Sequence, residues 1–108
     1  MSNQHYAVVG VTFEDRQSIL SDFYRTYKVG GKYGVSLEAE PQNPYDPNAI
    51  SVSLECADGE YRQVGYISKQ DNVSLGKALG KVRTARLLSM GPNSKGDIGL
   101  NIDVEFDD

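Results

Sequence analysis

Tyr45 and Asp46 stand side by side in residues 43–50, a segment otherwise rich in turn-forming prolines and asparagines. Asn-Pro and Asp-Pro steps both favour turns, but a turn does not require a tyrosine. The ring of Tyr45 could stack on a nucleobase. The carboxylate of Asp46 only accepts hydrogen bonds, so it would select a hydroxyl group and repel a phosphate. The pair therefore has the chemistry to recognise a free nucleotide end.

A purely structural role for the same segment stays open. Asp46 could accept backbone N–H bonds from Asn48 or Ala49, which is ordinary turn chemistry. Tyr45 is the residue that this interpretation explains worst.

Two further rings and several basic residues are candidates for the same site. Tyr66 follows Gly65, and a glycine inside a strand often marks a bulge or a close backbone approach. Tyr66 could face the site or be buried in the core, and Phe13 has the same two alternatives. Arg16 and Lys69 could pair with phosphates, as could Lys77 and Lys81, or all four could be solvated surface residues.

Alternating apolar and polar residues predict the elements that must position these side chains. The pattern predicts about six short strands and two helices, and the strands are mostly linked by hairpins. Such a pattern favours a small, partly open barrel over a parallel sheet. We expect strands at 6–13, 35–39, 50–54, 61–67, 84–90 and 100–106, a helix at 15–27, and a second helix capped by Ser68 that holds Val73, Leu75, Leu79 and Val82. The expected core is Val8, Val35, Leu37, Ile50, Val52, Leu54, Val64, Ile67, Leu79, Leu87, Ile102 and Val104.

The length of 108 residues predicts one domain over residues 1–108. The single Cys56 excludes an internal disulfide framework, and nothing resembles a signal peptide or a membrane span. We therefore expect a cytoplasmic protein without membrane contact. No His/Cys cluster has metal-ligand spacing, and no glycine-rich loop has a nucleotide-binding pattern. We expect no cofactor, no metal and no catalytic activity.

The net charge of −4 argues against a generic nucleic-acid coat, but the charges are unevenly distributed. Residues 62–95 carry seven basic residues and one acidic residue, whereas residues 1–61 carry four basic and nine acidic residues. Residues 96–108 carry five acidic residues and no basic one. A basic segment between acidic ones fits a small anion-binding site, and it also fits a surface whose charges pair after folding.

Four short motifs, taken in order, resemble the HIRAN domain. This family occurs at the amino end of fork-remodelling helicase-like translocases and also as stand-alone bacterial and phage proteins. The motif at 43–50 is specific, whereas the others are weak singly. The motifs are Val8–Val11 with Arg16-Gln17, Leu37–Pro41, Asn43–Ile50 and Val64–Ile67, and the resemblance spans residues 6 to about 106, nearly the whole chain.

The resemblance implies a mainly β fold, an OB-like six-stranded β-barrel with two added helices. It also implies binding to the 3′ end of single-stranded DNA. In the family, the tyrosine and aspartate of this motif help to hold the terminal nucleotide and its 3′-hydroxyl. Those roles carry to Tyr45 and Asp46, with Asn43 in support, and the aromatic residue after the first strand corresponds to Phe13.

This sequence departs from the fork-remodelling members at two places. Thr12 stands where they tend to have a basic residue, and Tyr66 stands where some of them have histidine. Phosphates would then be held more weakly, or through Arg16 and Lys69 instead.

We expect a non-catalytic module that recognises single-stranded DNA by its 3′-hydroxyl end in DNA repair or replication, together with a helicase, nuclease or other repair enzyme. Two alternatives stay open. The overall acidity and Thr12 would also suit a protein-interaction module that docks on a DNA-processing enzyme without binding DNA. The weaker alternative is a small enzyme or nuclease accessory with metal-bound carboxylates.

Overall fold

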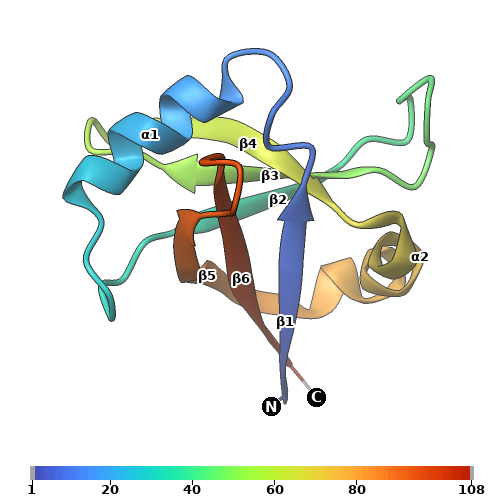
Figure 1. Ribbon diagram of the computed structural model, residues 1–108. Coiled ribbons are helices and arrows are strands. Elements are labelled where there is room, and N and C mark those ends of the chain that lie inside the picture. Colours follow the sequence, from blue (N-terminus) through green and yellow to red (C-terminus); the bar gives the residue numbers. More distant parts are fainter. Residues whose placement is uncertain (1, 108) are drawn as a thin grey trace.

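Six antiparallel strands form one sheet in the computed structural model, which describes residues 2–107 (Figure 1). The strand order across the sheet is β2-β3-β4-β1-β6-β5. The elements are β1 (Ser2–Val9), α1 (Arg16–Thr26), β2 (Val35–Ala39), β3 (Ile50–Glu55), β4 (Tyr61–Ile67), α2 (Lys69–Ala78), the 3₁₀ helix η1 (Leu79–Lys81), β5 (Val82–Pro92) and β6 (Ile98–Phe106).

The first strand lies earlier in the chain than the sequence predicted. It was expected at residues 6–13, but β1 begins at Ser2, and Ser2 to Ala7 pair with β6. It ends at Val9 because Gly10 adopts a positive φ of 71° and starts a turn. Phe13 therefore lies in this turn and not in a strand.

The last two residues of β1 pair with β4 instead, with Val8 opposite Ile67 and Val9 opposite Tyr66. A Cβ at Gly65 would collide with the carbonyl oxygen of Val9 and the side chain of Val8. The close backbone approach predicted for this glycine is therefore confirmed. It brings Tyr66 next to the turn that follows β1.

The sheet curls but does not close. Within residues 2–107, an isolated bridge joins its two edges between Gly34, just before β2, and Arg86 of β5, and there the backbone N–H of Leu87 donates to the carbonyl of Tyr33 at 2.9 Å. The predicted mainly β fold with six strands and two helices is confirmed for the described residues. The predicted barrel is not confirmed, because the sheet is not closed.

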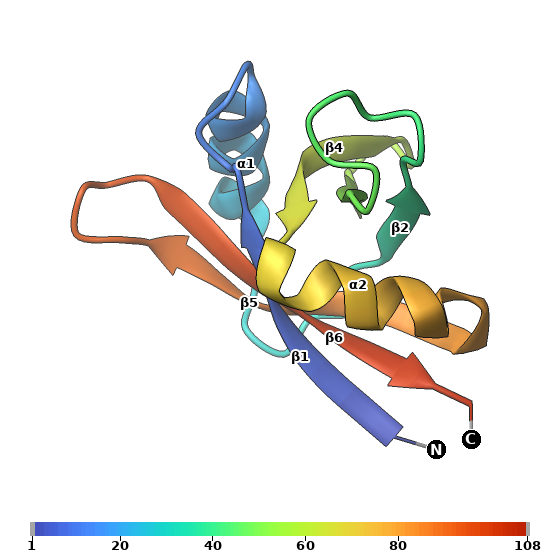
Figure 2. The ribbon, with the colours of Figure 1, turned by 90° about the vertical axis from the view of Figure 1, so that its right-hand side faces the viewer.

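The two helices cover different parts of the curled sheet (Figure 2). Helix α1 contacts β4 and β6 and buries Leu20 completely. Helix α2 begins as predicted, since the Ser68 hydroxyl accepts the Gln70 backbone N–H at 3.2 Å. The helix holds Val73 and Leu75 as predicted, but it is shorter than predicted, because Leu79 begins η1 and Val82 begins β5.

The core lies inside the curl of the sheet. Every predicted core residue is buried except Leu37 and Leu79, which are partly buried and pack against the core. The buried apolar residues outside the predicted core are Leu20, Ala49, Leu75, Ile98, Leu100 and Phe106. Neither helix in residues 2–107 is long and apolar enough to cross a membrane.

Candidate functional site

The loop between β2 and β3 is held in shape by its own polar groups. The Asn43 side-chain carbonyl accepts the backbone N–H groups of Tyr45 at 2.9 Å and Asp46 at 3.1 Å. The Ala49 N–H donates to the Asp46 carbonyl at 3.0 Å, and the Glu40 N–H donates to the Ala49 carbonyl at 2.9 Å. These bonds and the two prolines leave the loop few alternative conformations.

Tyr45 projects from this loop into solvent. It is 91% exposed, and no ring pair or cation–ring contact in residues 2–107 involves it. A tyrosine ring is a large apolar surface, and an exposed ring adds no packing energy to the fold. Because Tyr45 does not pack against the fold, the turn presents its ring to the solvent.

The carboxylate of Asp46 is fixed from two sides. Oδ1 accepts the Asn48 backbone N–H at 2.9 Å, and Oδ2 accepts the Asn72 side-chain amide at 2.9 Å. The pKa of Asp46 lies below its ordinary value, chiefly because its carboxylate accepts from the Asn48 N–H and, to a smaller extent, from the Asn72 amide. The charge of Lys69 adds a smaller effect in the same direction, whereas desolvation acts in the opposite direction. The turn interpretation of Asp46 is thus confirmed for Asn48, but each oxygen keeps a second lone pair for another donor.

Asn72 is a site residue that the sequence did not reveal. It lies on α2 and is only 3% exposed, although its amide is polar. Its bond to Asp46 joins residues 26 positions apart. The available signal was a polar residue three positions before Leu75, on the buried side of α2.

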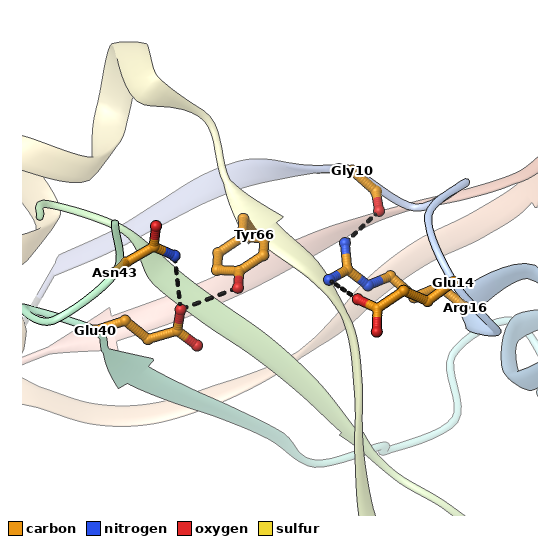
Figure 3. Close-up of polar contacts among 6 residues, drawn as sticks. All are labelled: Gly10, Glu14, Arg16, Glu40, Asn43 and Tyr66. Atoms are coloured by element: carbon orange, nitrogen blue, oxygen red, sulfur yellow. Dashed lines mark hydrogen bonds and ion pairs between the residues drawn. The ribbon is translucent and has the colours of Figure 1, made fainter. Parts of the chain in front are cut away.

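Tyr66 is joined to the same loop through Glu40, which the sequence placed only in a strand pattern. The Tyr66 hydroxyl donates to Glu40 Oε1 at 2.9 Å, and the Asn43 amide donates to the same oxygen at 3.0 Å (Figure 3). Tyr66 is half-buried, so neither alternative, full exposure to the site or burial in the core, describes it completely.

Arg16 is a buried residue, and the interpretation of it as solvated surface is wrong. Its guanidinium donates to the Gly10 carbonyl at 2.6 Å and to Glu14 Oε1 at 3.2 Å, and it lies 5.3 Å from the centre of the Tyr66 ring (Figure 3). Only 8% of its side chain is exposed. Arg16 therefore braces the turn after β1 against β4, and both of its terminal nitrogens donate hydrogen bonds.

Phe13 lies on that turn and is 64% exposed, so the alternative of a core role is wrong. A Cβ at Gly10 would lie 3.7 Å from the Phe13 ring and 3.9 Å from the Tyr66 ring, so both rings lie beside this glycine. Lys69 is exposed at the start of α2, where its charge acts on Asp46.

The predicted site residues thus lie in two adjoining groups. One group lies around Tyr45 and contains Asn43, Asp46 and Lys69. The other group lies beside Tyr66 and contains Phe13 and Arg16. Glu40 links the two groups. The arrangement offers exposed rings, an ionised acceptor and a nearby cation. In residues 2–107, no three His, Cys, Asp or Glu side chains are placed to hold a metal ion.

Comparison with known proteins identifies the family. None of the curated proteins compared matches this chain. The crystal structure of the HIRAN domain of human HLTF is similar, with a TM-score of 0.58 and 24% sequence identity over 95% of this chain and 74% of that one. At that identity the likeness bears on the fold alone. The family model of the HIRAN domain matches residues 1–104, almost the full length. This chain belongs to the HIRAN domain family, as its four motifs indicated.

Proposed function

We propose that this HIRAN domain is a non-catalytic module that binds single-stranded DNA by its 3′-hydroxyl end. One observation carries the proposal: a ring that is 91% exposed stands beside a carboxylate whose orientation is fixed from two sides. Tyr45 stacks on the terminal base, and Asp46 accepts a hydrogen bond from the 3′-hydroxyl. A terminal phosphate in the same position would be repelled by the ionised carboxylate.

The exposed rings give the site its affinity for bases. Stacking of a base on an aromatic side chain contributes about 1–3 kcal/mol and does not depend on sequence. Phe13 adds a second exposed ring beside the half-buried Tyr66. Arg16 supports these two rings, and Asn43 supports Tyr45, so both act chiefly by fixing the side chains that touch DNA.

Phosphate contacts are few in this proposal. Lys69 is exposed beside Asp46, whereas the guanidinium of Arg16 is almost covered. Each phosphate contact to single-stranded DNA changes the slope of log affinity against log salt by about −0.7, so a shallow slope is expected. Such a module would deliver strand ends to a helicase, a nuclease or another enzyme of repair or replication, in the cytoplasm.

The experiment compares a linear oligonucleotide with a circular one of the same sequence, which has no end. Fluorescence anisotropy competition should show tight binding only for the linear DNA. Asp46→Asn should remove the preference, whereas Asp58→Asn should not. Asp58 is a matched control because its Oδ1 also accepts the backbone N–H of the residue two positions later, at 3.0 Å. Equal binding of linear and circular DNA would refute recognition of an end.

A protein-docking module is the second candidate, and the exposure of Phe13 and Tyr45 favours it, because exposed rings also serve protein interfaces. Failure of every oligonucleotide to bind at low salt, combined with a defined complex with a DNA-processing enzyme, would decide for it.

A further inference from the structure

A basic surface lies at the far end of α1, within the part of the chain that is acidic in sum. Residues 23–37 contain Arg25, Lys28 and Lys32 and no acidic residue. Both lysines are exposed. The Arg25 side chain is 78% exposed, and its Nη1 pairs with Asp22 Oδ1 at 3.4 Å. Arg16, the remaining basic residue of positions 1–61, is buried. The exposed basic side chains of positions 1–61 therefore all lie at this end of α1.

A row of aromatic rings borders these cations. Tyr24 stacks on Tyr27 with ring centres 6.1 Å apart, Tyr27 contacts Tyr33 at 5.6 Å, and Tyr33 meets Phe23 edge-on at 5.1 Å. The outer member, Tyr24, is 38% exposed. Aromatic rings beside cations are the combination that single-stranded nucleic acids use, since bases stack and phosphates pair.

The loop that carries the lysines is fixed to the rest of the fold. The Lys28 backbone N–H donates to the Tyr33 hydroxyl at 2.9 Å, and the Gly31 N–H donates to the Lys28 carbonyl at 2.9 Å. The carbonyl of Tyr33 accepts the Leu87 N–H of β5. Because the backbone is already ordered, binding a ligand here would not have to order it.

Helix α1 sets the spacing between this surface and the candidate site. Its first residue, Arg16, contacts Gly10 and Tyr66, and its last turn carries Tyr24 and Arg25. Eleven residues give a helix about 16 Å long at roughly 1.5 Å per residue. Both views place the 10–15 turn and the 28–34 loop at opposite ends of α1 (Figures 1 and 2). Counted from the start of α1, that distance corresponds to about five nucleotides of a strand that stacks as in a duplex, at roughly 3.4 Å each.

We infer that Tyr24, Arg25, Lys28 and Lys32, here called the α1-end surface, bind a single strand of DNA about five nucleotides away from the Phe13 and Tyr66 group of the candidate site, on a strand whose end that site holds. The inference rests on the proposed function for the position of that end. Cations after a helix C-terminus also complement the helix dipole. That role concerns Arg25 and Lys28 but gives no reason for Lys32 or for the exposed ring of Tyr24.

The test measures binding of a trinucleotide and a dodecanucleotide, both with a 3′-hydroxyl, over a range of salt concentrations. The variant Lys28→Gln/Lys32→Gln is compared with Lys77→Gln/Lys81→Gln, which removes the same charge from exposed positions in α2 and η1, where the proposed function places no phosphate contact. For the dodecanucleotide, the first variant should flatten the salt slope by about 1.4, from two contacts at about 0.7 each. Trinucleotide binding should not change, and the control variant should behave as the wild type.

The inference is overturned if the dodecanucleotide binds no more tightly than the trinucleotide, or if both lysine variants change the slope equally. A second variant, Tyr24→Leu, should weaken dodecanucleotide binding about fivefold or more and leave the trinucleotide unaffected. If the dodecanucleotide binds through Lys28 and Lys32 while the trinucleotide does not bind, the α1-end surface stands and the proposed end site fails.

Discussion

The bond between Asp46 and Asn72 predicts that a residue of the exposed loop also stabilises the fold. Asn72 is 3% exposed, and its amide donates to Asp46 Oδ2 at 2.9 Å. In Asp46→Ala this buried amide loses its acceptor, and an unsatisfied buried donor costs about 1–3 kcal/mol. For a domain of this size, each kcal/mol lowers the melting temperature by about 4–8 °C.

The assay is urea and thermal unfolding followed by circular dichroism, arranged as a double-mutant cycle. The variants are Asp46→Ala, Asn72→Leu and the double variant. Replacing both partners by apolar groups can be nearly neutral, so the double variant should be more stable than the sum of the single effects predicts. Asp46→Asn keeps one acceptor oxygen, which can serve the Asn48 N–H or the Asn72 amide but not both, so its stability should lie between those of the wild type and Asp46→Ala.

Asp58→Ala is the control, because Asp58 makes a similar turn bond but pairs with the exposed Arg62 instead of a buried amide. If Asp46→Ala is no more destabilising than Asp58→Ala, or if the cycle shows no coupling, Asn72 does not hold Asp46 and the reasoning is refuted.

Three further predictions concern the loop, the sheet and pH. Tyr45→Ser should weaken DNA binding by about 1–3 kcal/mol without lowering the melting temperature. The control Tyr61→Ser, at a ring that is 49% exposed, should leave DNA binding intact. Fluorescence anisotropy measures the binding, and calorimetry measures the melting temperature. Gly65→Ala should lower the free energy of unfolding in urea by about 1–3 kcal/mol, because the added Cβ would collide with the Val9 carbonyl oxygen. A variant as stable as the wild type would contradict that close approach. The folded state lowers the pKa of Asp46, so the carboxylate is ionised over a wider pH range than in the unfolded chain. Its contribution to stability and to hydroxyl recognition is therefore complete above the ordinary carboxyl pKa of about 3.9. That contribution is lost only as the pH falls through the lower pKa of the folded state. End binding that declines between about pH 7 and pH 5 in step with the NMR titration of Asp46 would contradict this.

The sequence predicted most elements because their patterns are local. Alternation in β2 and β3 and the cap at Ser68 each depend on neighbouring residues. The limits of β1 were wrong because Ser2 to His5 are polar and pair with β6, which is distant in sequence. Closure of the sheet depends on the distance between β2 and β5, which no local pattern encodes.

The candidate site was predictable only where one segment carries its chemistry. Tyr45 and Asp46 lie in a single motif, and their exposure and polarity follow from the turn. Asn72 and Glu40 were missed because their roles arise from hydrogen bonds across 26 residues, to Asp46 and Tyr66. Arg16 was expected at the surface because basic residues usually lie there. Its burial follows from the Gly10 carbonyl and the Tyr66 ring, which only the fold brings together.

The most direct measurement is a titration of this domain with two oligonucleotides that differ only at the 3′ end, one with a hydroxyl and one with a phosphate. Asp46 can accept a hydrogen bond from the hydroxyl and repels the phosphate. The hydroxyl form should therefore bind at least tenfold more tightly, which corresponds to about 1.4 kcal/mol. Asp46→Asn should narrow this difference in affinity. Equal affinity for the two oligonucleotides would contradict the role assigned to Asp46 and, with it, recognition of the strand end.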